Sequence, residues 1–242
     1  MQRPLPPAAV VGIVALGLLA LLALVMAKPL GLDLPPVVAS LLWFLVPLTG
    51  ASIVAGTDVL KELGLTRFHS RGVAVVLLGS LAMGVGMALG GEEAVFDAGL
   101  MWRKAARAGL VEEIGFRGFA FGLLFWRARW SFVAAMGVTG AAFGAFHLPM
   151  AVLGGHLDQA WGAALLTGAG GCWFAWLYAR WDRSLWVPIA AHVGMNFWWT
   201  LYTAGPTAAG GGSGAMWGRV ATITLVTVAT SRMTPPLGRD RG

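Results

Sequence analysis

The chain has 242 residues, of which 57% are hydrophobic and only 12% carry a charge, and its formal net charge is +6. A soluble domain has about 25% charged residues, so the composition excludes an ordinary soluble protein and indicates a polytopic membrane protein. The basic residues form short clusters between apolar runs rather than one stripe, which argues against nucleic acid as a partner.

The apolar runs predict an all-α fold, a polytopic membrane helix bundle with about eight transmembrane helices. A helix that spans the bilayer needs about 20 mainly apolar residues. The first run is longer than the apolar core of a cleaved signal peptide, so we expect it to be the first span. The last run is short and interrupted by Arg219. In chain order, the eight predicted spans are 7–27, 34–56, 72–90, 109–126, 131–150, 160–179, 184–203 and 216–231.

Proline and glycine separate these runs, and no internal repeat or change of composition marks a second domain. We therefore expect one integral-membrane domain over residues 1–242. With eight spans, most basic clusters fall on the same side as both termini, and that side is predicted to be cytoplasmic. These clusters are Arg3; Lys61, Arg67 and Arg71; Arg127 and Arg129; Arg180 and Arg183; and Arg232, Arg239 and Arg241.

One basic cluster departs from this pattern, because Arg103, Lys104 and Arg107 fall on the opposite side. Two explanations stay open: an amphipathic helix at the interface, or a fourth span that begins before residue 109. The abundance of Ala, Gly and Leu indicates a GC-rich prokaryotic genome, so the expected location is a prokaryotic plasma membrane.

Three of the predicted spans contain polar residues that are costly in a bilayer and therefore mark candidate functional positions. The fourth span contains Glu112, Glu113 and Arg117. Glu113 and Arg117 are four residues apart and can form an ion pair on one helix face. Glu112 is rotated by about 100° from Glu113 and can point elsewhere. One carboxylate would then be neutralised by the arginine, while the other is available for chemistry.

The other two spans repeat the spacing of four residues. Phe143 and His147 share a face of the fifth span, and His192 and Asn196 share a face of the seventh. A glutamate and two histidines in one cavity could activate water with the glutamate as general base, or could bind zinc and an activated water. Asn196 could donate a hydrogen bond to a developing oxyanion.

Each of these residues also has a structural explanation. A histidine or asparagine in a span often only bonds to a neighbouring helix, and a buried Glu–Arg pair can be purely structural. It is the joint occurrence of the three groups that favours a catalytic site.

The three groups resemble the motifs of the CPBP (Abi) family of intramembrane proteases, which includes the type II CAAX prenyl endopeptidases. The family pattern is EExxxR, then FxxxH, then HxxxN, on three separate apolar segments. Here the motifs are EEIGFR at 112–117, FGAFH at 143–147 and HVGMN at 192–196, in the same order. The resemblance covers about residues 105–205, which we take as the catalytic core.

The resemblance implies an intramembrane endopeptidase whose substrate is a membrane-associated peptide or protein, with lipidated, CAAX-like peptides as candidates. It assigns Glu112 and His147 to water activation, and His192 and Asn196 to the oxyanion hole. Glu113 and Arg117 would support the site, with Phe143 packing beside it. We favour a metal-free mechanism without cofactor, because no HExxH helix is present; zinc bound by Glu112, His147 and His192 is the alternative.

Two other classes of function compete with the protease. Intramembrane glutamate and histidine could relay protons in a proton-coupled transporter. The chain could also be a catalytically silent membrane protein that acts in immunity or as a scaffold. A transporter often has two similar halves, which this sequence lacks, and a silent partner would tolerate substitution of Glu112, His147 and His192.

Overall fold

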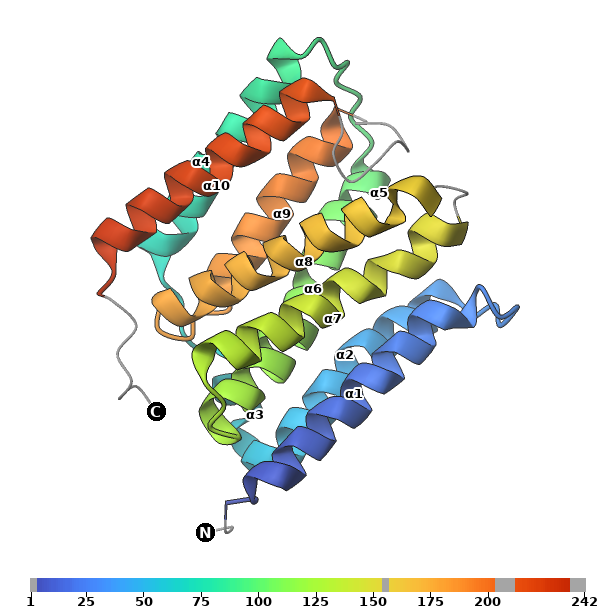
Figure 1. Cartoon of the computed structure of the whole chain (residues 1–242), viewed down its shortest axis with the longest axis vertical. Coiled ribbons are helices and arrows are strands. Elements are labelled where there is room, and N and C mark those ends of the chain that lie inside the picture. Colours follow the sequence, from blue (N-terminus) through green and yellow to red (C-terminus); the bar gives the residue numbers. More distant parts are fainter. Residues whose placement is uncertain (1–3, 154–156, 203–211, 236–242) are drawn as a thin grey trace. The chain divides into compact units, whose positions relative to one another are not determined.

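A computed structural model describes residues 4–153, 157–202 and 212–235. Within these ranges the chain forms helices and no strand, so the predicted all-α fold is confirmed. Of the basic residues used for the topology, Arg3, Arg239 and Arg241 lie outside the described ranges. The long helices, labelled in Figure 1, are α1 (Pro7–Ala27), α2 (Pro36–Ala55), α4 (Ser70–Leu89), α7 (Phe132–Leu153), α8 (Leu157–Arg180), α9 (Trp186–Leu201) and α10 (Ser213–Met233).

Among the residues that the structure describes, four helical segments are long and apolar enough to cross a membrane: Pro7–Ala27, Pro36–Glu62, Ser70–Leu89 and Phe132–Pro149. They coincide with the first, second, third and fifth predicted spans, and they indicate a membrane protein. The other four predicted spans are also helical in the described residues. That these four cross the bilayer stays a prediction, as does the side on which the termini lie.

The helix that carries the EExxxR motif begins earlier than the apolar run. Asp97 caps it, since its Oδ1 accepts a hydrogen bond from the Leu100 amide at 2.8 Å. Helical structure then continues from Ala98 to Arg127. The basic residues Arg103, Lys104 and Arg107 are therefore part of the same helix as Glu112 and Glu113, as the second of the two explanations requires.

This helix alternates between α and π geometry. The α-helical pieces α5 (Ala98–Met101) and α6 (Ala108–Glu113) alternate with π-helical η2 (Trp102–Arg107), η3 (Ile114–Phe121) and η4 (Leu123–Arg127). π-Helix is rare and occurs mostly as short bulges, often at functional sites. Arg117 lies within η3, and the Gly122 amide donates to the carbonyl oxygen of Arg117, five residues before it.

The chain folds into two compact units. Unit 1 comprises Met1–Thr66 and Val111–Ala175, and unit 2 comprises Arg67–Leu110 and Trp176–Gly242. The chain passes from one unit to the other within α6 and within α8, as well as after Thr66. One domain over residues 1–242 stays a prediction.

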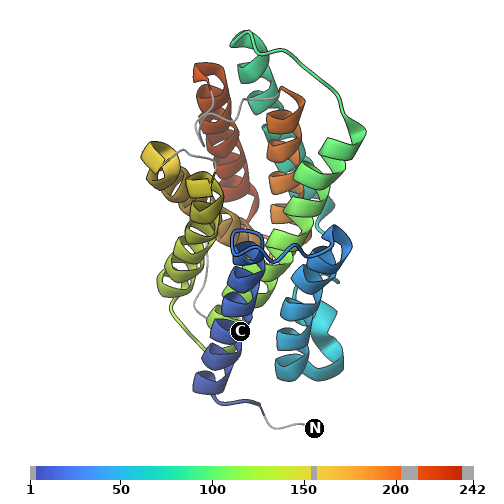
Figure 2. The ribbon, with the colours of Figure 1, turned by 90° about the vertical axis from the view of Figure 1, so that its right-hand side faces the viewer.

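In unit 1, α1 and α2 form an antiparallel hairpin that packs on η3 and η4 of the helix over residues 98–127, the motif helix (Figure 2). The Phe119 ring lies so close to both helices that a Cβ atom on Gly17 or Gly50 would come within 2.6 Å and 2.5 Å of it. At the end of η4, the Arg127 guanidinium donates two hydrogen bonds to the buried Glu62 carboxylate of the short helix α3 (Val59–Glu62). These bonds raise the pKa of Arg127 above its ordinary value.

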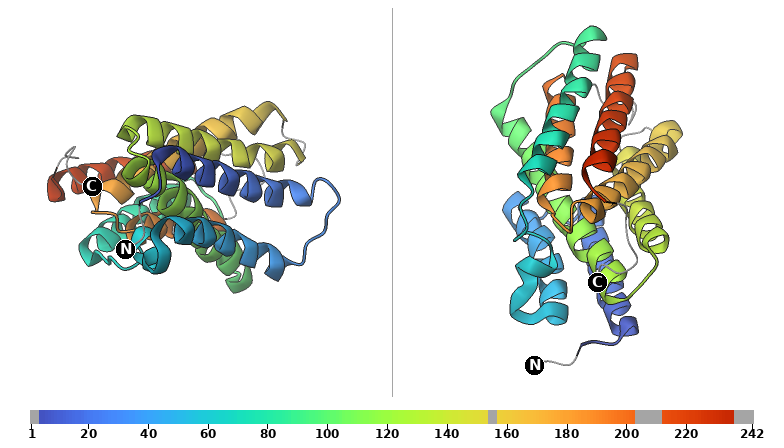
Figure 3. Two further views of the ribbon diagram at one scale, coloured as in Figure 1. Left: turned by 90° about the horizontal axis from the view of Figure 1, so that it is seen from below. Right: turned by 90° about the vertical axis from the view of Figure 1, so that its left-hand side faces the viewer.

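In unit 2, α4 lies against both α9 and α10 (Figures 1 and 3). The α4–α10 contact depends on glycine, because a Cβ atom on Gly86 would lie 2.6 Å from the Gly214 carbonyl oxygen and 2.7 Å from the Gly218 Cα. Small residues at helix crossings permit this approach in membrane proteins. Between α4 and α9, the Trp198 indole donates to the Ser80 hydroxyl at 3.3 Å.

We expect Gly86→Ala to destabilise unit 2 by about 1–3 kcal/mol, because the added methyl group meets backbone atoms that cannot rotate away. The measurement is the fraction of protein that remains monodisperse in detergent after heating. Gly12→Ala is the matched control, since a Cβ atom at Gly12 meets nothing within 4 Å. Equal thermal stability of the two variants would contradict the proposed α4–α10 packing.

Candidate active site

Arg117 is fully buried in unit 1, with 1% of its surface exposed. Its Nη1 lies 3.0 Å from Oε1 of Glu113, which is also fully buried. The ion pair predicted from the spacing of four residues is therefore confirmed. Removing a charge from water costs several kcal/mol per ion, so a buried guanidinium requires favourable partners.

Aromatic rings supply further partners for Arg117. Its guanidinium carbon lies 4.3 Å from the Phe143 ring centre, 5.1 Å from that of Phe174 and 5.9 Å from that of Phe116. Cations within about 6 Å of an aromatic ring are attracted by its electron density, and the attraction grows when water is absent. Three helical segments, η3, α7 and α8, thus contribute a ring to the same cation.

Phe143 connects Arg117 to His147. Its ring centre lies 4.8 Å from that of His147, at an interplanar angle of 69°. Its carbonyl oxygen also accepts a hydrogen bond from His147 Nδ1 at 2.8 Å. Because a carbonyl oxygen can only accept, Nδ1 must carry the proton, and Nε2 is the nitrogen that a neutral imidazole has available for a proton or a metal ion. The FxxxH spacing therefore fixes both the position and the tautomer of the histidine.

Glycine residues of α7 and α8, which run side by side, make room for this arrangement (Figure 3, left). A Cβ atom on Gly171 would lie 3.1 Å from Phe143 Cδ1 and 3.3 Å from Arg117 Nη2. On α7, a Cβ atom on Gly140 would lie 3.0 Å from the carbonyl oxygen of Gly168. The close approach of α7 to this part of α8 therefore brings Phe174 to the guanidinium.

The two adjacent glutamates of the motif have different environments. Glu113 is fully buried beside Arg117, whereas Glu112 is half-buried. The Glu112 carboxylate also interacts electrostatically with the Arg117 guanidinium. The two carboxylates therefore differ in exposure, and the predicted division of roles between them stays a prediction.

The HxxxN motif lies in unit 2, on α9. His192 is 7% exposed. Asn196 Nδ2 donates a hydrogen bond to the Lys104 carbonyl oxygen of η2 at 3.2 Å. Val193 packs directly on Gly109, where a Cβ atom would lie 2.8 Å from Val193 Cγ2. Within this unit, α9 is thus fixed against the first half of the motif helix, and one of the two N–H bonds of the Asn196 amide remains for another acceptor.

Unit 1 brings Glu113, Arg117, Phe143 and His147 together, and Glu112 interacts with the same arginine. His192 and Asn196 belong to unit 2, so a site made of all six polar residues stays a prediction. Neither unit holds, among its described residues, a group of three or more His, Cys, Asp or Glu side chains that could bind a metal ion. His147 Nε2 is suitable as a ligand, and the zinc alternative stays a hypothesis.

Sequence reasoning missed four residues that shape these groups: Phe116, Phe174, Gly171 and Lys104. Phe116 lies inside the EExxxR motif, and its ring contacts those of Phe143 and Phe146 at 4.9 Å and 5.0 Å between centres. Gly171 had a detectable signal, because the GAGG sequence at 168–171 indicates a close helix contact. No sequence signal pointed to Phe174 or Lys104, because each acts through a contact with a residue that is distant in the sequence.

The comparison with protein families agrees with the motifs. Residues 94–198 match the family model described as Rce1-like, type II CAAX prenyl endopeptidase Rce1-like. This segment contains all three motifs, and the resemblance to the CPBP family is confirmed over it. No curated protein and no solved structure matches the chain.

The buried pair predicts a non-additive response to substitution. Glu113→Gln or Arg117→Met alone should destabilise the protein by about 3–5 kcal/mol, because each leaves the partner's charge buried without its counter-ion. The double variant should lose less than the sum of the two. The measurement is the amount of folded protein in membranes together with its thermal midpoint in detergent. Strictly additive losses would show that the two charges do not stabilise each other.

Proposed function

We propose that this chain is an intramembrane endopeptidase that hydrolyses a peptide bond of a membrane-associated substrate without a catalytic metal. The match to an Rce1-like family model supports a CAAX-type intramembrane endopeptidase in general. The observation that carries the catalytic assignment is the contact series Glu113–Arg117–Phe143–His147, which joins the EExxxR and FxxxH motifs in one buried cluster.

In the proposed reaction, Glu112 and His147 activate a water molecule. Glu112 accepts one of its protons while the oxygen attacks the carbonyl carbon of the scissile peptide. His147 Nε2 accepts a hydrogen bond from the same water and orients it, since Nδ1 is committed to the Phe143 carbonyl. The proton held by Glu112 then passes to the leaving amine as the carbon–nitrogen bond breaks, which regenerates the carboxylate.

His192 and Asn196 are proposed to stabilise the negative oxygen of the tetrahedral intermediate. A hydrogen-bond donor fixed before the reaction contributes most, because it does not have to reorganise as charge develops. The Asn196–Lys104 hydrogen bond restrains the amide in this way and supports the assignment. Glu113 and Arg117 are positioning residues in this proposal, because they act through Phe143 and His147.

The substrate is proposed to be a peptide that reaches the site from the membrane, and lipidated CAAX-like peptides are the first to test. Hydrolysis requires water, whereas hydrocarbon excludes it, so the site must be reached by water from one interface.

We expect Glu112→Gln to lower kcat by about 10²–10⁴-fold while the protein remains folded, because the amide cannot accept the proton from water. The assay is cleavage of a quenched-fluorescent lipidated peptide library by purified protein in detergent. Glu93→Gln is the matched control: Glu93 is exposed in the loop before Ala98, and its substitution should leave cleavage unchanged. Full activity of Glu112→Gln would remove Glu112 from the mechanism, and cleavage by neither enzyme would favour the silent membrane partner.

The metal-free mechanism predicts that a strong chelator leaves the cleavage rate unchanged. The assay is the same, with wild-type protein dialysed against the chelator and then returned to buffer with or without zinc. Activity that disappears with the chelator and returns with zinc would support the alternative in which Glu112, His147 and His192 bind the metal ion.

A further inference from the structure

Unit 2 contains a cavity of about 480 Å³ that is separate from the motif residues of this unit. It is formed where the first turn of α4, the turn that follows α8 and the last turn of α10 meet. Its lining includes His69, Ser70, Arg71, Arg180 and Thr234. Ligand-binding pockets commonly measure about 300–1,000 Å³, so the size suits a small polar group.

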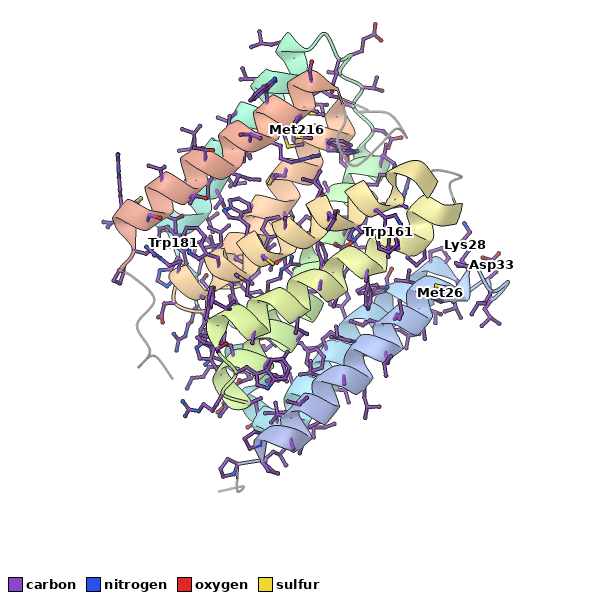
Figure 4. The ribbon with its side chains drawn as sticks, viewed as in Figure 1. Met26, Lys28, Asp33, Trp161, Trp181 and Met216 are labelled. Atoms are coloured by element: carbon purple, nitrogen blue, oxygen red, sulfur yellow. The ribbon has the colours of Figure 1, made fainter. Side chains whose placement is uncertain are left out.

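Trp181 forms an inner wall of this cavity and is labelled in Figure 4. It is buried, and its indole donates to the Thr230 hydroxyl of α10 at 3.2 Å. On the other side its ring lies 6.1 Å from that of His69. The position of the Trp181 side chain is therefore fixed by contacts with α10 and with the residue that precedes α4.

Arg180 is held rigidly in the lining. Its Nε donates to the Thr234 hydroxyl at 2.8 Å, and its Nη2 donates to the Thr234 carbonyl oxygen at 2.8 Å. Both acceptors are neutral atoms, so these bonds fix the guanidinium without cancelling its charge. Asp182, the acidic residue of the lining, forms an ion pair with Arg67 at 2.8 Å.

Arg71 differs from Arg180 because it is exposed and forms no hydrogen bond or ion pair with the rest of the described chain. It lies in the first turn of α4, where His69 is the N-cap and contributes no side-chain cap. The first amides of a helix have no partner within it, and they favour a negatively charged group. The lining thus brings Arg71, Arg180 and Ser70 together with the first turn of α4 around one cavity.

The surroundings of the cavity are those of a membrane surface. α4, which begins at Ser70, is one of the four helices that are long and apolar enough to span a bilayer. At the rim, Phe68 is 64% exposed and Met233 is 48% exposed. A lining that combines cationic side chains with exposed apolar side chains matches a phosphate that is joined to an acyl chain.

From these contacts we infer that the cavity binds a phosphate group, and that an anionic phospholipid of the cytoplasmic leaflet supplies it. Anionic lipids concentrate in that leaflet, and the distribution of basic residues predicts that Arg67, Arg71, Arg180 and Arg183 lie on the cytoplasmic side. Arg71 is the side chain that closes on the phosphate, while Arg180 and Trp181 form the fixed wall. This site is independent of the proposed peptidase activity.

The test measures the binding of phosphatidylglycerol to the full chain in neutral detergent by native mass spectrometry. Wild-type protein should retain the lipid, and Arg71→Gln should bind it about tenfold more weakly, because a charge-assisted contact is lost. Arg71→Lys should restore part of the affinity. Arg232→Gln is the matched control: Arg232 is exposed in the last turn of α10 and outside the lining, and its loss removes the same charge.

Two further arms identify the source of the phosphate. Phosphatidylcholine should bind more weakly than phosphatidylglycerol, and inorganic phosphate should not displace the lipid if the lipid is the ligand. Displacement by millimolar inorganic phosphate that depends on Arg71 would support the phosphate site and assign it to a soluble ligand instead. Equal lipid binding by wild-type, Arg71→Gln and Arg232→Gln proteins would overturn the proposal.

Discussion

The burial of the Arg117 charge is the constraint on which the rest of unit 1 depends. Arginine remains protonated inside proteins, so the cost of burial must be offset by its surroundings. Glu113 supplies the opposite charge from one turn earlier, and Phe143, Phe174 and Phe116 supply ring faces. The three rings belong to η3, α7 and α8. The contacts that stabilise the buried guanidinium therefore also determine how these three helical segments pack.

The same requirement gives the arginine a route to the proposed site without direct contact. Phe143 contacts Arg117 with its ring and His147 with both its ring and its carbonyl oxygen. A shift of the guanidinium would displace the ring, and with it the helix turn that orients the imidazole. In unit 2, the Asn196–Lys104 hydrogen bond plays a comparable part for the third motif, since it ties a side chain of α9 to the backbone of η2.

Local features were predictable from the sequence. The Glu113–Arg117 pair follows from spacing along one helix, and α1 coincides with its apolar run because Pro7 starts it and polar residues follow it. Tertiary features were not predictable, because Phe174 reaches Arg117 only through the approach of α8 to α7. Hydropathy left open whether the motif helix begins before residue 109, because it does not register the Asp97 cap, and no pattern indicated the π turns.

The hydrogen bond between His147 Nδ1 and the Phe143 carbonyl has a consequence for the cost of moving protons. In the neutral ring and in the imidazolium alike, Nδ1 carries a hydrogen, so this bond persists when Nε2 gains or loses its proton. The imidazole ring therefore keeps the same orientation in both charge states, and the Phe143 carbonyl oxygen keeps the same hydrogen-bond donor. A histidine anchored in this way can change charge with little reorganisation, which suits an interior where rearranging dipoles is slow and expensive.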